Sequence, residues 1–394
     1  MRRKTGFLML EMGSSKTVSL LSYSSEKIRV GMAPSQGMER GKVVDLIQQE
    51  KSIRQALENL REEDLPESLY LGISGEVFQF RKENVSLERK DREVEITENE
   101  IRRLLSTAGE RGTRGTAWET IHTIPLNYRV GKLGKVKNPL FMEGEELSTE
   151  CIIVTLLATT QDTFIRCINQ AGFGVERIFF LPYTTGEILL DEEEKQMGTI
   201  MIDAGEGITD ISVYRENSLR DLRVLPMGGK DLTLHIAHRL KIPSREAEKL
   251  KKEKGVALRF MADRETIKVQ GFSEEKEIDR RELAEMIEEW IWIYLSRIEE
   301  LIRPHLKNIS AGMVVCGGMA NLAGFSEALS EYFSLPVRIV SPPPYAPLPS
   351  SPEYSSTWAF LKFLEKNRDR EAVFSIPPYL RPFRNLLHWL REKI

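Results

Sequence analysis

Two stretches of this chain repeat one layout. Residues 7–33 (FLMLEMGSSKTVSLLSYSSEKIRVGMA) and 199–225 (TIMIDAGEGITDISVYRENSLRDLRVL) both run as an apolar strand, an acidic residue, a turn around glycine, a second strand, a polar turn and a third strand. Two such sub-structures facing each other would place two acid-and-glycine turns across one cleft. The alternative is a chance similarity of two hairpins. The motifs farther along the chain argue against this alternative.

The second turn concentrates negative charge. Asp203, Glu206 and Asp210 surround Gly205 and Gly207, although like charges repel and glycine raises the entropy cost of folding. Glycine also lets backbone N–H groups come close to phosphate oxygens, because no Cβ intervenes. A cation and a polyanion held at this turn would account for the pattern. A tight hairpin whose acids are merely solvated is the alternative.

Magnesium suits such a turn. The ion is hard, octahedral and reluctant to lose water, so carboxylates often hold it through waters while it bridges two phosphates. Its positive charge would reduce the repulsion among Glu11, Asp203 and Glu206.

Two further elements offer contacts to a nucleotide. The turn Gly13-Ser14-Ser15-Lys16 has hydroxyl and ammonium donors for a terminal phosphate, and Gly317-Gly318, after the strand MVVC, would let an adenine or ribose lie flat against backbone. A plain strand-to-helix turn is the alternative for this glycine pair. No GxxxxGK[ST] sequence occurs, so a P-loop is excluded as the phosphate cradle.

Composition sets the broad class. A chain of 394 residues with 41% apolar content is expected to form two or more domains. Its 56 basic and 59 acidic residues leave a net charge of −3, which argues against nucleic-acid binding. Three cysteines without a CxxC pair fit a reducing cytosol. No segment approaches the ~18 apolar residues needed to span a bilayer.

Periodicity and turn signals divide the rest of the chain. They predict helices over about 45–60, 184–193 and 355–366, strands at 69–74, 151–158 and 175–180, and a charged, largely helical region at 230–309. Thr97 and Glu100 form a capping box that predicts a helix start. The proline-rich stretch 341–352 reads as a loop.

The chain ends in an amphipathic pattern (382–394) behind a polar, proline-rich linker (367–381). On a helical wheel, a stripe about 100° wide holds five large apolar residues, with basic residues beside it and an indole near its edge. These are Phe383, Leu386, Leu387, Leu390 and Ile394, flanked by Arg384 and Arg391 on one side and Lys393 on the other, and Trp389. Such a helix lies in a membrane surface. Docking on its own domain or on a partner is the alternative.

One tail is expected to bind a membrane weakly. Burial gains roughly 1.5–3 kcal/mol per large side chain, and ordering about twelve residues costs a comparable sum. Several tails on one polymer would bind firmly through their effective concentration.

At this point the motifs carry a resemblance. Asp203-x-Gly205-x-Gly207-x-Thr209-Asp210, Glu11-x-Gly13 and Gly317-Gly318 resemble the phosphate-2, phosphate-1 and adenosine elements of the actin-like ATPase superfamily. Within it, GMERGKVVDL (37–46), VKNPL (136–140), LPMGGKDLT (225–233) and SREAEKLKKEKG (244–255) are similar to the FtsA family of bacterial cell-division proteins, in the same order over nearly the whole chain.

The resemblance implies a fold and its subdivision. The fold would be α/β and actin-like, with two RNase H-like βββαβαβα cores around a nucleotide cleft. The implied subdomains are 1A (1–84, 164–197 and 342–366), an inserted, SHS2-like 1C (85–163), 2A (198–229 and 310–341) and 2B (230–309).

For the site, the resemblance implies ATP and hydrated magnesium, the ion being organised by Glu11 and Asp203. The nucleotide would contact Gly13, Ser14, Ser15 and Lys16 in the first turn, Gly205, Glu206, Gly207 and Thr209 in the second, Glu248 and Lys251 on a following helix, and Gly317, Gly318 and Met319. An ordinary solvated helix face is the alternative for Glu248 and Lys251. Asp210 is the one candidate for a base in the cleft.

The second loop departs from the family's usual DIGGGTTD, in that Glu206 replaces a glycine and Ile208 a threonine. An acid close to phosphate oxygens should weaken nucleotide binding unless magnesium lies between them. ATP binding with weak or absent hydrolysis is therefore expected. Glu11 also stands where many relatives have aspartate.

The resemblance finally implies a function. The protein would polymerise, tether the FtsZ ring to the cytoplasmic face of the inner membrane at the division site, and recruit division proteins. Residues 230–309 would receive the FtsZ C-terminal peptide, and 85–163 would serve self-association and downstream partners. The alternatives are a PilM-like, actin-like pilus-assembly ATPase and a metabolite kinase of the same fold, which would need a base for a substrate hydroxyl.

Overall fold

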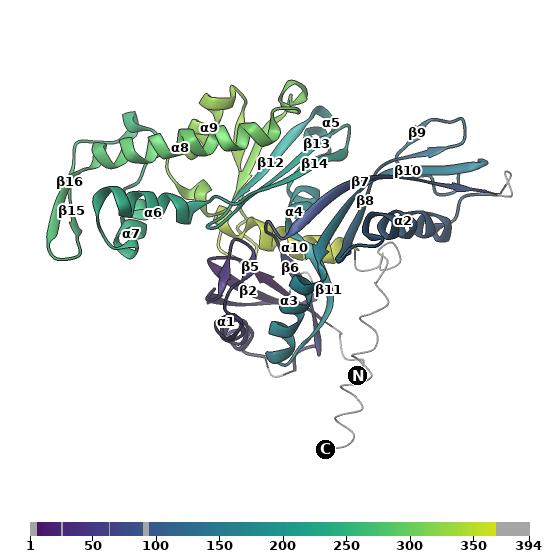
Figure 1. Cartoon of the computed structure of the whole chain (residues 1–394), viewed down its shortest axis with the longest axis horizontal. Coiled ribbons are helices and arrows are strands. Elements are labelled where there is room, and N and C mark those ends of the chain that lie inside the picture. Colours follow the sequence, from purple (N-terminus) through teal and green to yellow (C-terminus); the bar gives the residue numbers. More distant parts are fainter. Residues whose placement is uncertain (1–5, 25–26, 63, 90–93, 368–394) are drawn as a thin grey trace, which may run out of the picture. The chain divides into compact units, whose positions relative to one another are not determined.

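The computed structural model describes residues 6–24, 27–62, 64–89 and 94–367 (Figure 1). The predicted amphipathic tail, 382–394, and all but the first residue of the linker lie outside these ranges. The chain divides into two compact units. Among the described residues, unit 1 takes 6–38, 42–181 and 361–367, and unit 2 takes Glu39–Gly41 and Pro182–Phe360. No helix in the described ranges is both long and apolar enough to cross a membrane.

The central sheet of unit 1 has five strands in the order β11-β6-β1-β2-β3. The first three strands of the chain pair antiparallel, and β6 and β11 then add in parallel. The strands are β1 (Phe7–Met12), β2 (Lys16–Ser24), β3 (Lys27–Pro34), β6 (Ser68–Ile73) and β11 (Gly174–Phe180). Every residue of β1 is buried, as expected for a central strand covered on both faces. Helices α1 (Leu46–Glu58) and α3 (Ala158–Gln170) pack against this sheet and each other.

Unit 2 contains the same five-stranded arrangement, in the order β14-β13-β12-β17-β18. Its strands are β12 (Thr199–Ala204), β13 (Thr209–Arg215), β14 (Ser218–Leu225), β17 (Gly312–Cys316) and β18 (Val337–Ile339). Again three antiparallel strands are followed by two parallel ones. Glu11 faces Val18 in the first hairpin, and Asp203 faces Asp210 at the matching place in the second. The sequence repeat is therefore a structural repeat.

The remainder of unit 2 is mostly helical, as predicted. It contains α6 (Gly229–Leu240), α7 (Ser244–Lys254) and the long α8 (Arg280–Ile302), followed after β17 by α9 (Phe325–Phe333). The prediction missed the β15 (Thr266–Gln270) and β16 (Glu275–Asp279) hairpin between α7 and α8. More and less exposed residues alternate along both strands. Each strand is only five residues long and has charged neighbours, so the alternation was not recognised in the sequence.

One helix predicted as a single run is two. The helix expected at 184–193 is α4 (Leu181–Leu189) followed by α5 (Glu192–Met197). Asp191 separates them, because its side chain accepts the Glu194 N–H at 2.7 Å while Glu194 accepts the Asp191 N–H at 3.0 Å. This capping box starts a new helix inside the predicted one. The helix predicted at 355–366 is α10 (Ser355–Asn367).

Between β6 and α3 in the sequence, the chain of unit 1 forms a second, antiparallel sheet covered by one helix. The sheet order is β7-β10-β8-β9, formed by β7 (Phe78–Glu88), β8 (Trp118–Val130), β9 (Lys135–Val136) and β10 (Glu146–Leu157). Helix α2 (Glu98–Thr113) lies along one face of this sheet (Figure 1). It starts at Thr97 with the predicted capping box to Glu100. We call this module the insert.

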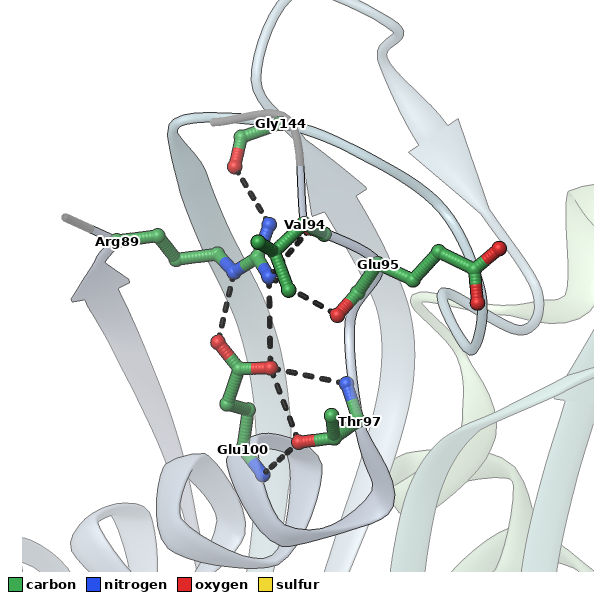
Figure 2. Close-up of polar contacts among 6 residues, drawn as sticks. All are labelled: Arg89, Val94, Glu95, Thr97, Glu100 and Gly144. Carbon is green, nitrogen blue, oxygen red and sulfur yellow. Dashed lines mark hydrogen bonds and ion pairs between the residues drawn. The ribbon is translucent and has the colours of Figure 1, made fainter. Parts of the chain in front are cut away.

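A buried arginine ties the loops of the insert to the start of α2. Arg89, whose side chain is 3% exposed, donates to Glu100 Oε1 at 2.7 Å. Figure 2 shows that its guanidinium also reaches three backbone carbonyls, those of Gly144 (2.8 Å), Val94 (2.8 Å) and Glu95 (3.2 Å). The Arg89 hydrogen bond is the largest influence on the Glu100 pKa, which it lowers. Arg89 therefore satisfies backbone groups that would otherwise lack partners.

Candidate nucleotide-binding site

The two repeated turns close in the same way. Gly13 N–H donates to Lys16 O at 3.0 Å in the first turn, and Gly205 N–H donates to Ile208 O at 2.9 Å in the second. At the tips, the backbone N–H groups of Ser14, Ser15, Glu206 and Gly207 donate no hydrogen bond within the described part of the chain. Each turn thus offers two adjacent free donors, the arrangement that binds anions in backbone nests.

The backbone at the start of α6 is hydrogen-bonded to the second turn. Gly229 N–H donates to Gly205 O at 3.0 Å, and Lys230 N–H donates to Glu206 O at 2.8 Å. A Cβ added at Gly228 would lie 2.6 Å from both of these carbonyl oxygens, so only glycine allows this approach. Sequence reasoning matched Gly228 and Gly229 to the family without giving them a role. Two glycines directly before a helix were the available signal.

Thr209 and Asp210 begin the strand after the turn, and both are buried. The Thr209 hydroxyl lies 2.9 Å from Met227 O and 2.6 Å from the Tyr294 hydroxyl. These contacts join β13 to α8 in the core, so the Thr209 side chain stabilises the turn from its buried side. Burial raises the pKa of Tyr294, which keeps this phenol neutral.

Helix α7 places Lys251 against the start of α6. Its ammonium donates to Gly229 O at 2.8 Å and to the Thr233 hydroxyl at 2.8 Å, and pairs with Glu248 Oε2 at 2.7 Å. The Lys251 side chain is only 11% exposed, so it does not lie on an ordinary solvated helix face. Burial lowers the Lys251 pKa, against the opposing effect of Glu248. For Glu248, burial favours a higher pKa, but hydrogen bonds from Lys251 and Thr233 outweigh it and the net shift is downward.

Gly317, which follows directly after β17, lies next to Asp203 and Ala204. Gly317 has φ +88, and a Cβ there would lie 2.4 Å from Ala204 O and 2.5 Å from Asp203 Oδ1. A Cβ on Gly318 would meet nothing within 4 Å, so this residue presents open backbone. Met319 is buried, and its sulfur lies 3.3 Å from a Cβ built on Gly229. Residues 203–209, 228–230, Lys251 and 317–319 therefore gather in unit 2.

Glu206 is electrostatically strained at the tip of the second turn. Burial raises the pKa of its carboxyl, and the nearby Glu248 raises it further, while Lys230 and Lys251 oppose the shift. Because the folded-state pKa lies above the unfolded one, this group's contribution to stability is complete below the unfolded pKa. It is lost as pH rises through the raised folded pKa.

Glu206→Gln should therefore stabilise unit 2 at alkaline pH and change little in acid. The midpoint of thermal unfolding is expected to rise by a few degrees at pH 8, since about 1 kcal/mol shifts the midpoint by about 2–4 °C in a domain of this size. Calorimetry of both proteins between pH 4 and pH 8 measures this. A difference that grows as pH falls would contradict it.

The residues fit a nucleotide with hydrated magnesium. Free N–H donors and a close glycine cradle suit phosphate oxygens. Glu11 in unit 1 and Asp203 in unit 2 are the next-to-last residues of the corresponding strands of the repeat. Among the described residues, no group of three or more His, Cys, Asp or Glu side chains could hold a metal ion directly. A magnesium ion held through its waters does not need such a group.

Comparison with known proteins identifies the family. The model for "Cell division protein FtsA" matches residues 200–359, and that for "SHS2 domain inserted in FTSA" matches 75–155. The FtsA protein of Pseudomonas aeruginosa is 29% identical, with 84% of this chain and 82% of that protein covered. The FtsA protein of Bacillus subtilis is 27% identical, covering 94% of this chain and 87% of the relative.

Solved structures share the fold at lower identity. A PilM–PilN type IV pilus biogenesis complex is 16% identical with a TM-score of 0.66, covering 92% of this chain and 99% of that chain. MreB5 of Spiroplasma citri, solved with ADP, is 13% identical with a TM-score of 0.56, covering 93% and 99%. The predicted actin-like two-domain fold is confirmed. With its repeated core, its insert and its sequence relatives, the chain belongs to the FtsA family of cell-division proteins.

Proposed function

We propose that this FtsA-family protein binds magnesium-ATP at its repeated acid-and-glycine turns and uses the bound nucleotide to control assembly on a membrane. The matched geometry of the turns carries the proposal: both follow a central strand whose next-to-last residue is an acid, and both expose two adjacent N–H donors. The ADP bound by MreB5 in the same fold supports a nucleotide here.

Each part of the site would have a distinct task. The N–H groups of residues 14–15 and 206–207 would bind phosphate oxygens, with the Lys16 ammonium nearby in the first turn. Glu11 and Asp203 would orient the hydration shell of magnesium, whose charge offsets that of the phosphates. Glu248 and Lys251 would contact the ribose or base, with Gly317, Gly318 and Met319 beside the adenosine.

Hydrolysis is proposed to be slow or absent. Glu206 carries a carboxyl into the second turn, and Ile208 brings no hydroxyl there. Asp210 is the remaining candidate for a base, and it is buried within β13. The nucleotide would then act mainly through its occupancy, which would favour polymerisation.

The protein's partners follow from its family. It would link the FtsZ ring to the cytoplasmic face of the inner membrane at the division site, with residues 230–309 receiving the FtsZ C-terminal peptide. Two exposed aromatics there, Phe260 (80% exposed) and Phe272 (76%), offer apolar contacts to a peptide. The insert would serve self-association and the recruitment of downstream division proteins.

Substitutions in the C-terminal tail test the proposal that the protein binds a membrane. Leu387→Glu/Leu390→Glu should reduce binding to anionic lipid vesicles by about 100-fold or more, because two apolar side chains worth roughly 1.5–3 kcal/mol each are lost from the bilayer. Flotation of the full-length protein with ATP measures binding. The control, Leu387→Ile/Leu390→Ile, keeps the apolar face and should float like the unmodified protein. Equal flotation of all three proteins would remove the tether from the account.

A further inference from the structure

A short hairpin lies between β3 and α1 in the chain. It consists of β4 (Met38–Glu39) and β5 (Lys42–Val43), which pair with each other. Both residues of its turn have positive φ, Arg40 at 47° and Gly41 at 76°, as tight two-residue hairpin turns require. Met38 and Lys42 belong to unit 1, whereas Glu39–Gly41 belong to unit 2.

Two ion pairs within unit 2 hold the hairpin tip to the first turn of α6. Arg40 Nη2 lies 2.8 Å from Asp231 Oδ1, and Lys230 Nζ lies 3.1 Å from Glu39 Oε1. The charges alternate on both sides, with Glu39 before Arg40 and Lys230 before Asp231. A slip of one residue would bring like charges together, so the two pairs fix the register of the contact.

The same turn of α6 holds the second phosphate turn. Lys230 N–H donates to Glu206 O at 2.8 Å, and Gly229 N–H donates to Gly205 O at 3.0 Å. Asp231 fixes this turn of helix, since its Oδ2 accepts the Gly228 N–H at 2.9 Å while its Oδ1 faces Arg40. Lys230 thus contacts the hairpin through its side chain and the phosphate turn through its backbone N–H.

We propose that Glu39 and Arg40 are positioning residues for the second phosphate turn, acting through Lys230 and Asp231. This inference rests on the proposed function, and names two further positioning residues of the same site. Because Lys230 and Asp231 also shape the start of α6 that contacts the second phosphate turn, loss of the two ion pairs loosens that turn.

The strength of the contact suits a reversible link. Glu39 and Lys230 are 51% and 48% exposed, and Arg40 is 44% exposed against 21% for Asp231. Exposed pairs of this kind contribute modestly to stability, so they can form and break as the nucleotide changes. The Lys230 hydrogen bond is the largest influence on the Glu39 pKa, which it lowers.

The test removes the hairpin charges and leaves α6 intact. In Glu39→Gln/Arg40→Gln, the net charge is unchanged and no residue of the phosphate turn is altered. The matched control is Arg297→Gln/Glu300→Gln, which removes an exposed pair of the same types on α8. Two quantities are measured in the full chain: amide hydrogen exchange at Gly229 and Lys230 without nucleotide, and the affinity for magnesium-ATP.

We expect exchange at these two amides to speed up about 3- to 10-fold and ATP affinity to fall by a similar factor, with less than about a 2-fold change in the control. The conservative Glu39→Asp/Arg40→Lys variant should restore both quantities. Unchanged exchange, or an equal effect in the control, would overturn the inference. Unmodified protein that takes up no ATP would instead refute the proposed function, while the exchange measurement would still decide the role of the hairpin.

Discussion

Asp203→Asn is expected to weaken the binding of magnesium-ATP by about 10- to 100-fold, the factor that corresponds to losing one charge-assisted hydrogen bond. Asparagine has the shape of aspartate, so the close packing against Gly317 is kept. The loss should appear only with magnesium, because the proposed role of the carboxylate is to orient the waters of the ion. Without magnesium, ATP should bind equally or better, since one negative charge near the phosphates is gone.

The magnesium dependence separates this role from a structural one. Titration calorimetry with and without magnesium measures it, with Asp263→Asn as the control, because the Asp263 side chain is 91% exposed in the same unit. A loss of the same size in both conditions would assign Asp203 to the shape of the turn. No loss in either condition would remove it from the site.

Arg89→Met should destabilise the insert by about 1.5–3 kcal/mol, the contribution of hydrogen bonds made by a charged group, since Arg89 is buried while its partner Glu100 is 28% exposed. Methionine keeps much of the apolar stem and leaves the Glu100 carboxylate and three backbone carbonyls without their donor. The control is Arg102→Met, which removes an exposed pair with Glu98 on α2 and should cost less than about 1 kcal/mol. Hydrogen exchange of α2 and β10 measures local unfolding of the insert.

The effect of Arg89→Met should depend on pH. The Glu100 pKa is lowered in the folded protein, chiefly by the Arg89 hydrogen bond. Its contribution is therefore present above the unfolded pKa of the carboxyl and is lost as pH falls through the lowered folded pKa. The difference between Arg89→Met and the unmodified protein should narrow in acid. A difference that stays constant to low pH would show that lost packing, not the charge pair, dominates.

Much of the fold could be predicted from local patterns. The repeat at 7–33 and 199–225 predicted both antiparallel halves of the central sheets, because apolar alternation and glycine turns are local signals. The Thr97–Glu100 capping box predicted the start of α2 for the same reason. The subdomain boundaries stay a prediction.

What sequence patterns missed was set by contacts between distant residues. Strand β18 has three residues and owes its place to pairing with β17. The 38–43 hairpin has two-residue strands, and its partners on α6 lie far along the chain. Lys251 was open to two interpretations from its charged helix, and only the packing of α7 on α6 showed that it is buried.

One property is central to the proposed function: the capacity of the repeated acid-and-glycine turns to bind a nucleotide. Titration calorimetry of the unmodified full chain with ATP, in the presence and absence of magnesium, tests this property. The account predicts saturable binding of one ATP per chain that magnesium strengthens and Asp203→Asn weakens. No detectable heat at millimolar ATP or ADP, under conditions where the protein is folded, would contradict it and leave a membrane anchor without nucleotide control.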